Sequence, residues 1–146
     1  MLRTLAALFW TAGPATACQT ALILAMDVSN SVDMGEYRLQ TDGLAAALRE
    51  PEIVDILVRD QVALSVIQWS GADRQEVSLD WQQIYAPAQA RAVAAAVDRM
   101  PRAFVLSDTA PANALDFAVR HFQTAPDCPR RIIDMSKTRN DSFLRN

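Results

Sequence analysis

Three oxygen-bearing side chains follow an apolar run near the start of the chain, with one residue between each pair. Residues 21–26 are apolar, the run ends at Asp27, and Ser29 and Ser31 come next. Such a run is typical of a central strand in a parallel sheet, because helices cover both faces of that strand. Open α/β sheets bind ligands in the crevice beyond the carboxyl ends of their strands. We therefore expect Asp27, Ser29 and Ser31 to converge at that edge of a sheet.

One carboxylate and two hydroxyls make a set of hard oxygen donors. This set suits Mg²⁺, with Mn²⁺ or Ca²⁺ as alternatives, because these hard cations prefer oxygen ligands. Helix capping is a second interpretation, in which Ser31 or Asp33 caps the following helix and Glu36 completes a capping box. Capping leaves Asp27 and Ser29 unexplained, and the two interpretations are compatible.

The size and composition of the chain limit the classes of protein to which it can belong. It has 146 residues, of which 51% are hydrophobic, and this combination predicts one domain with one core. The formal net charge is −3, and the basic residues form no cluster. The sequence therefore does not indicate a nucleic acid or an anionic membrane surface as a partner.

Helical and strand patterns alternate along the rest of the chain. The expected helices cover residues 33–48, 88–100 and 112–122, and after the first strand the expected strands cover 62–69, 76–81 and 131–135. Pro51 is interpreted as a break that ends the first helix. Residues 76–81 alternate with one polar face, which predicts an antiparallel edge strand paired with 62–69. The fold class predicted is α/β, with a mostly parallel sheet.

The first 17 residues predict a secretory signal peptide. Arg3 precedes a short apolar segment, and residues 15–17 supply small side chains at the spacing of a cleavage site. An amphipathic helix is the alternative for this segment. Cleavage would leave Cys18 at the new terminus, where lipidation is a secondary alternative, and would leave no stable membrane span. We expect a periplasmic or secreted protein.

Four motifs in order resemble the von Willebrand factor A-type (vWA) domain. Asp27-x-Ser29-x-Ser31 resembles its metal-ion-dependent adhesion site (MIDAS), and the set is similar to an exported proteobacterial subfamily. The other motifs occupy residues 68–71, 109–118 and 128–136, so that the resemblance covers roughly 18–136. It implies a doubly wound, Rossmann-like fold and makes Thr109 a further ligand of the ion. A helix N-cap is the alternative role for Thr109.

The resemblance implies a binding module and not an enzyme. Asp27 would anchor a divalent cation, and the hydroxyls of Ser29, Ser31 and Thr109 would ligate it. An acidic group on a protein partner would complete the coordination. One alternative is a degenerate scaffold that holds no ion. Another is a Mg²⁺-dependent hydrolase or phosphotransferase with Asp27 as nucleophile. The chain has no second Asp two residues after Asp27 and no phosphate-binding glycine loop.

His121 is the single histidine and is expected to be a helix C-terminal residue.

The chain departs from the vWA pattern after Ser136. The resembled proteins continue Gly-Asp-Gly there, and that Asp is the third element of the adhesion site. Residues 137–146 show no apolar periodicity, which predicts a divergent, disordered tail. We do not expect Asp141 to replace the missing ligand. We expect a C-terminally incomplete domain over 18–136, from a truncated or frame-shifted gene, with the strand 131–135 as an exposed edge.

The chain contains two cysteines, Cys18 before the first expected strand and Cys128 before the last. An even number of cysteines in an exported chain favours a disulfide, and two unrelated thiols are the alternative. In the resembled domain the two strands are neighbours. The resemblance therefore implies that both cysteines lie at the same end of the sheet, where a bridge can form.

Overall fold

The computed structural model describes residues 18–106 and 108–136. The predicted signal peptide (1–17) and the predicted tail (137–146), with Asp141, lie outside the described residues. Helices and strands alternate in the order β1 (Thr20–Asp27), α1 (Met34–Ala47), α2 (Pro51–Arg59), β2 (Ala63–Trp69), β3 (Gln75–Gln83), α3 (Pro87–Asp98), α4 (Pro111–His121), the short 3-10 helix η1 (Phe122–Thr124) and β4 (Arg130–Met135).

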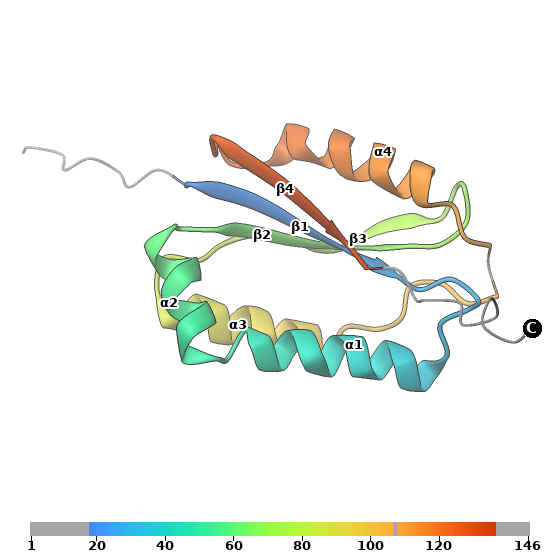
Figure 1. Cartoon of the computed structure of the whole chain (residues 1–146), viewed down its shortest axis with the longest axis horizontal. Helices are drawn as coiled ribbons and strands as arrows, with labels where there is room; N and C mark the ends of the chain where they lie inside the picture. Colours follow the sequence, from blue (N-terminus) through green and yellow to red (C-terminus); the bar gives the residue numbers. More distant parts are fainter. Residues whose placement is uncertain (1–17, 107, 137–146) are drawn as a thin grey trace, which may run out of the picture.

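The strands form one sheet in the order β3-β2-β1-β4. β1 runs parallel to both β2 and β4, whereas β3 is antiparallel to β2. Helices α1, α2 and α3 lie on one face of the sheet and α4 lies on the other (Figure 1). The predicted α/β class, with a mostly parallel sheet and an antiparallel edge strand, is confirmed. None of the described helices has the length and apolar content that crossing a membrane requires.

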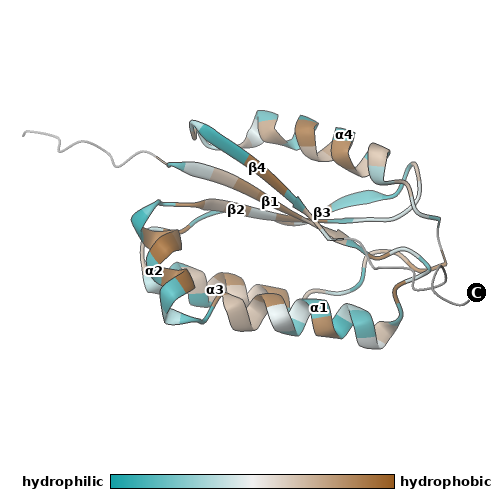
Figure 2. Cartoon of the chain, viewed as in Figure 1, coloured by the Kyte–Doolittle hydropathy of each residue, from teal (hydrophilic) through white to brown (hydrophobic). Residues whose placement is uncertain are grey.

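Each face of the sheet carries its own group of buried side chains. β2 is buried along its whole length, because it has a strand on either side and helices above and below. Ala114 and Ala118 of α4 pack against Ile23, Ile67 and Trp69, and small side chains four residues apart let this helix lie close to the sheet. In Figure 2, β4 begins with polar residues and its middle is apolar. It is less deeply buried than β2.

Helix α2 is absent from the elements expected from the sequence, and this is a correction. Pro51 does follow the end of α1, but it also occupies the first turn of α2. Proline favours that position because its fixed φ suits a helix and its missing N–H has no intrahelical acceptor there. Val54 and Leu57, three residues apart, bury one side of α2. The other expected elements agree with the structure to within two residues at each end.

The disulfide between Cys18 and Cys128 is present, so the alternative of two unrelated thiols is wrong. Their Cα atoms are 4.9 Å apart, and both residues are buried. Cys18 lies two residues before β1 and Cys128 two residues before β4, so the bridge joins the amino-terminal ends of two paired strands.

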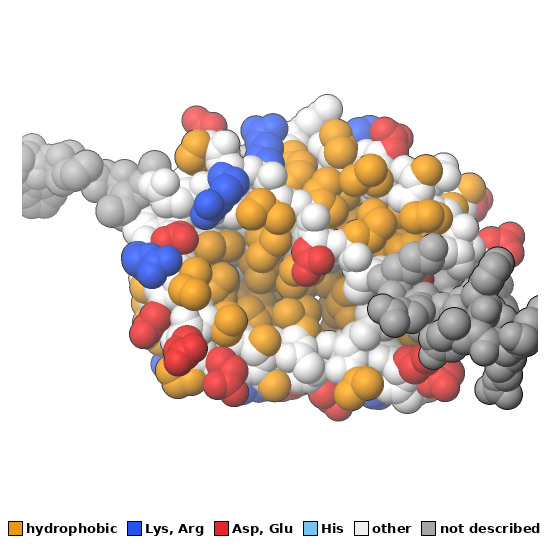
Figure 3. Space-filling view, in the orientation of Figure 1, with side chains coloured by type: hydrophobic (Ala, Val, Ile, Leu, Met, Phe, Trp, Pro, Cys, Tyr) orange, Lys and Arg blue, Asp and Glu red, His pale blue; other side chains and the backbone are white. Residues whose placement is uncertain are grey.

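β4 lies at an edge of the sheet, as expected. It pairs with β1 on one side, and among the described residues no strand pairs with the other side. Figure 3 shows exposed apolar side chains between α1 and β4. A cavity of about 180 Å³ opens there, lined by Leu24, Ala25, Met26, Gln40, Leu44, Asp134 and Ser136. β1 and β4 are therefore only partly covered on the face that carries α1.

Candidate functional site

Asp27 is the last residue of β1 and lies at the carboxyl edge of the sheet. Its side chain is buried, and its Oδ1 accepts a hydrogen bond of 2.8 Å from the backbone N–H of Ser29. The hydroxyls of Ser29 and Ser31 are 3.2 Å apart. Asp27, Ser29 and Ser31 therefore meet in one short loop, because the turn that Asp27 forms with its own backbone brings them together.

The capping interpretation explains other residues of the same loop. Asp33 is the N-cap of α1 and its Oδ1 accepts from the N–H of Glu36 at 2.8 Å. The Glu36 Oε2 accepts from the N–H of Asp33 at 2.8 Å, which completes a capping box. Ser31 does not cap the helix. Helix capping thus accounts for Asp33 and Glu36. It does not account for Asp27, Ser29 and Ser31.

The carboxyl end of β2 fixes two loops of the site. The N–H of Val28 donates to the carbonyl oxygen of Trp69 at 2.9 Å, and the N–H of Ala110 donates to that of Ser70 at 2.8 Å. The loop that carries Thr109 is therefore attached beside the loop that follows Asp27.

Thr109 is exposed and does not cap helix α4. The N-cap of that helix is Ala110, and no side chain forms a capping hydrogen bond there. The alternative role for Thr109 as an N-cap is therefore wrong. The Ser70 hydroxyl, next to this loop, is buried and has no hydrogen-bond partner among the described residues.

The carboxyl end of β4 also contacts the site, through Ser136. The N–H of Asp27 donates to the Ser136 hydroxyl at 3.2 Å, and that hydroxyl donates to the Gln40 Oε1 at 3.1 Å. The N–H of Ser136 donates to the carbonyl of Ala25 at 3.0 Å, continuing the ladder between β4 and β1. Gln40 and Ser136 were not predicted as site residues, because neither lies in the spaced motif.

Arg102 and Gln68 also contribute to the site without being predicted from the sequence. The Arg102 Nη2 donates to the carbonyl oxygens of Val28 and Ser29, at 2.9 and 3.0 Å. Gln68 binds the backbone on both sides of Arg102. The spacing of residues in the sequence does not predict these contacts, because each contact joins segments that are far apart in the chain.

The Asp27 carboxylate has no basic partner among the described residues. Among residues 18–106 and 108–136, no Lys, Arg or His side chain forms an ion pair with it. In the same part of the chain, no three His, Cys, Asp or Glu side chains are grouped as metal ligands. The Asp27 loop instead offers one carboxylate and several hydroxyls. These hard oxygen donors match Mg²⁺, Mn²⁺ or Ca²⁺.

A family model described as "Protein of unknown function (DUF1194)" matches residues 17–142. The chain belongs to this family. No curated protein sequence matches the DUF1194 chain.

Solved structures identify the fold of the DUF1194 chain as that of vWA domains. Proximal thread matrix protein 1 from the mussel byssus, with a zinc-occupied MIDAS motif, superposes with a TM-score of 0.56 at 15% identity over 86% of this chain and 30% of that one. A von Willebrand factor type A protein from Catenulispora acidiphila gives 0.53 at 20% identity over 80% of this chain and 26% of that one. The pilus adhesin SpaC from Lactobacillus rhamnosus GG gives 0.55 at 13% identity over 79% and 15%. The DUF1194 chain spans less than a third of the length of each, and at these identities the likeness shows the fold alone.

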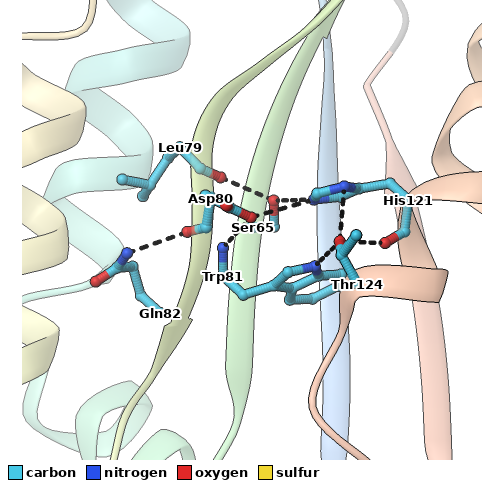
Figure 4. A network of polar contacts seen from close by, with 7 residues as sticks. All are labelled: Ser65, Leu79, Asp80, Trp81, Gln82, His121 and Thr124. Atoms are coloured by element: carbon cyan, nitrogen blue, oxygen red, sulfur yellow. Dashed lines mark hydrogen bonds and ion pairs between the residues drawn. The ribbon is translucent and has the colours of Figure 1, made fainter.

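His121 of the DUF1194 chain ends α4, as expected, and belongs to the polar network drawn in Figure 4. The buried Ser65 hydroxyl donates to the carbonyl of Leu79 at 2.8 Å and lies 2.9 Å from the His121 Nε2. Since Ser65 has one proton to donate, His121 Nε2–H is the donor between the two side chains. The Trp81 ring stacks on the imidazole, with ring centroids 5.0 Å apart. The network joins α4 to β2 and β3, and Ser65 is too deeply buried to be a nucleophile.

The stability of the DUF1194 chain is expected to fall when His121 becomes protonated. Burial lowers the pKa of His121, and the exposed Asp80 carboxylate, 3.8 Å from Nε2, opposes this only in part. The unfolded chain therefore binds this proton at a higher pH than the folded chain does. The contribution of neutral His121 to stability is complete above its ordinary pKa of 6.5 and is lost as the pH falls through the folded pKa.

Urea unfolding at pH 7.5 and pH 5.0 measures this effect. We expect the free energy of unfolding of the wild type to decrease more between these pH values than that of His121→Gln, which keeps a side-chain N–H donor but does not titrate. The carboxylates are common to both proteins, so the difference between the two pH dependences isolates His121. Equal pH dependences would contradict the assignment.

Proposed function

We propose that this DUF1194 chain is an exported, adhesion-type binding module that holds a divalent cation at the carboxyl edge of its sheet. Mg²⁺ is the ion we favour, with Mn²⁺ or Ca²⁺ as alternatives. Asp27 supplies the negative charge, and the hydroxyls of Ser29, Ser31 and Thr109 supply neutral oxygen ligands. The bound ion would act as a Lewis acid with an open position for a partner's ligand.

The observation that carries this proposal is the Asp27 loop. A buried carboxylate is costly unless a cation or several hydrogen bonds compensate for its charge. Asp27 is 1% exposed, receives a hydrogen bond from Ser29, and has no ion-pair partner among the described residues. Two hydroxyls 3.2 Å apart follow it directly. A hard cation supplies the missing positive charge and uses both hydroxyls.

The partner we propose is a protein that presents an acidic side chain to the ion. The mechanism we propose is coordination and not catalysis. Similar structures support this reading, because one carries a zinc-occupied MIDAS motif and another is a pilus adhesin. The disulfide supports export, because such bridges persist in oxidising compartments.

Calorimetric titration tests the proposal. Mg²⁺, Mn²⁺ and Ca²⁺ are added separately to the chain with its disulfide formed, and we expect saturable heat that EDTA reverses. A Mn²⁺-loaded sample then gives enhanced water relaxation, which acetate or a peptide with one Glu should reduce by displacing bound water. No binding heat in a chain that circular dichroism shows to be folded would overturn the proposal and favour a scaffold that holds no ion.

Thr109 provides a sharper test of the ligand set. Thr109→Val keeps the shape of the side chain and removes its hydroxyl, so we expect affinity for Mg²⁺ to fall by about 10-fold, the lower limit for loss of groups that support a metal site. Its melting temperature should not change, because Thr109 is exposed and caps no helix. Thr109→Ser restores the hydroxyl and should restore the affinity. Equal affinities of Thr109→Val and the wild type would exclude Thr109 from the ligand set.

A further inference from the structure

Arg102 binds the backbone of the loop that carries the proposed ligands. Its Nη2 donates to the carbonyl oxygens of both Val28 and Ser29. We propose that Arg102 is a positioning residue for the ion site and that Gln68 sets the position of Arg102. This inference rests on the function proposed above, because it assigns the element that gives the ligand loop its shape.

Gln68 holds the backbone on either side of Arg102. Its side-chain amide is completely buried in β2. The Gln68 Nε2 donates to the carbonyl oxygen of Pro101 at 2.9 Å, and the Oε1 accepts from the N–H of Ala103 at 2.9 Å. The hydroxyl of Tyr37 also donates to the carbonyl of Met100 at 2.9 Å. The segment 100–103 is therefore attached to β2 on both sides of Arg102, and to α1 through Tyr37. The backbone from which the Arg102 side chain extends is fixed.

The same arrangement holds the ligand loop from two directions. The N–H of Val28 donates to the carbonyl of Trp69, the residue after Gln68, at 2.9 Å. The carbonyl oxygen of Val28 accepts a hydrogen bond from Arg102 at 2.9 Å. Both peptide groups between Asp27 and Ser29 are thus fixed by β2, one directly and one through Arg102. A binding site needs its ligands held within about 0.5 Å of the productive geometry by such supporting contacts.

Because Arg102 is charged, the sign of the change in ion affinity on its removal distinguishes a positioning role from an electrostatic one. A guanidinium beside a cation site repels the cation, so its removal would tighten ion binding if charge were its main effect. A positioning role predicts the opposite sign. Arg102→Ala would leave the Val28 and Ser29 carbonyls without their donor, and the loop would sample other conformations.

The experiment combines ion affinity with hydrogen exchange in the metal-free protein. For Arg102→Ala we expect Mn²⁺ affinity to fall about 10–100-fold, the usual range for a supporting residue of a metal site. Amide exchange at Ser29 and Ser31 should become faster without any ion present. Arg102→Lys keeps a positive donor and should recover part of both effects. Arg99→Ala removes an exposed positive charge three residues earlier and serves as the matched control, with no change expected.

The role of Gln68 is tested through Arg102. Gln68→Met fills a similar volume without an amide, and we expect weaker Mn²⁺ binding. Because Gln68 acts through Arg102, the double variant with Arg102→Ala should bind Mn²⁺ no more weakly than Arg102→Ala alone.

Two results would overturn the inference. One is tighter Mn²⁺ binding by Arg102→Ala, which would assign the residue an electrostatic role. The other is unchanged exchange at Ser29 and Ser31. If the wild type binds no ion, the proposed function fails. The exchange measurement on the metal-free protein still decides whether Arg102 orders the loop.

Discussion

Asp27→Asn is expected to weaken Mg²⁺ and Mn²⁺ binding by more than about 100-fold, since loss of mere supporting groups already costs 10–100-fold. Asparagine has the same shape, and its side-chain oxygen can still accept the hydrogen bond from the Ser29 N–H. The change removes the negative charge of the loop and leaves its turn in place. Calorimetry with each ion measures the loss, and circular dichroism verifies that the fold persists.

Asp33→Asn is the matched control, because it removes the same charge from the same loop. Asp33 is exposed and caps α1, and Asn is as good an N-cap as Asp, so stability should change little. We expect ion affinity close to that of the wild type. If both variants weakened binding equally, the effect would be one of overall charge, and Asp27 would lose its assignment as the anchor of the ion.

The part of the site that the sequence predicts is the part formed by local chain geometry. Asp27, Ser29 and Ser31 lie within five residues, and a single turn brings them together. Thr109 is assigned by resemblance, and the structure attaches its loop to Ser70, the residue after β2. The supporting residues depend on contacts between distant segments, for which residue spacing gives no signal.

The fold was predictable for a similar reason, and the missed helix α2 shows the limit. Apolar runs and alternating patterns gave the strands and their order of appearance, because strand burial follows directly from side-chain pattern. Helix α2 was missed because proline both ends helices and begins them, and the first role was assumed for Pro51. The pattern of Val54 and Leu57 could have identified the helix, since it places apolar residues on one face.

Removing the disulfide is expected to have the largest effect on stability. The Cys18→Ala and Cys128→Ala double variant should lose about 4 kcal/mol of unfolding free energy, because the bridge closes a long loop and restricts the unfolded chain. The sequence separation of the two cysteines is 110 residues. The expected decrease in melting temperature is roughly 10–20 °C for a domain of this size. Reductant should lower the melting temperature of the wild type similarly and leave the variant unchanged.

The position of the disulfide predicts which part of the chain opens first when it is removed. β4 pairs with β1 alone among the described residues, and it is held at its two ends by the disulfide and by Ser136. Without the disulfide, the amino-terminal end of β4 should open locally, so amide exchange at Ile132 should accelerate more than at Val66 in β2. Equal acceleration at both positions would mean that the bridge acts only on the unfolded chain. A melting temperature within 2 °C of the wild type would contradict the prediction itself, because loop closure of this length should contribute several kcal/mol.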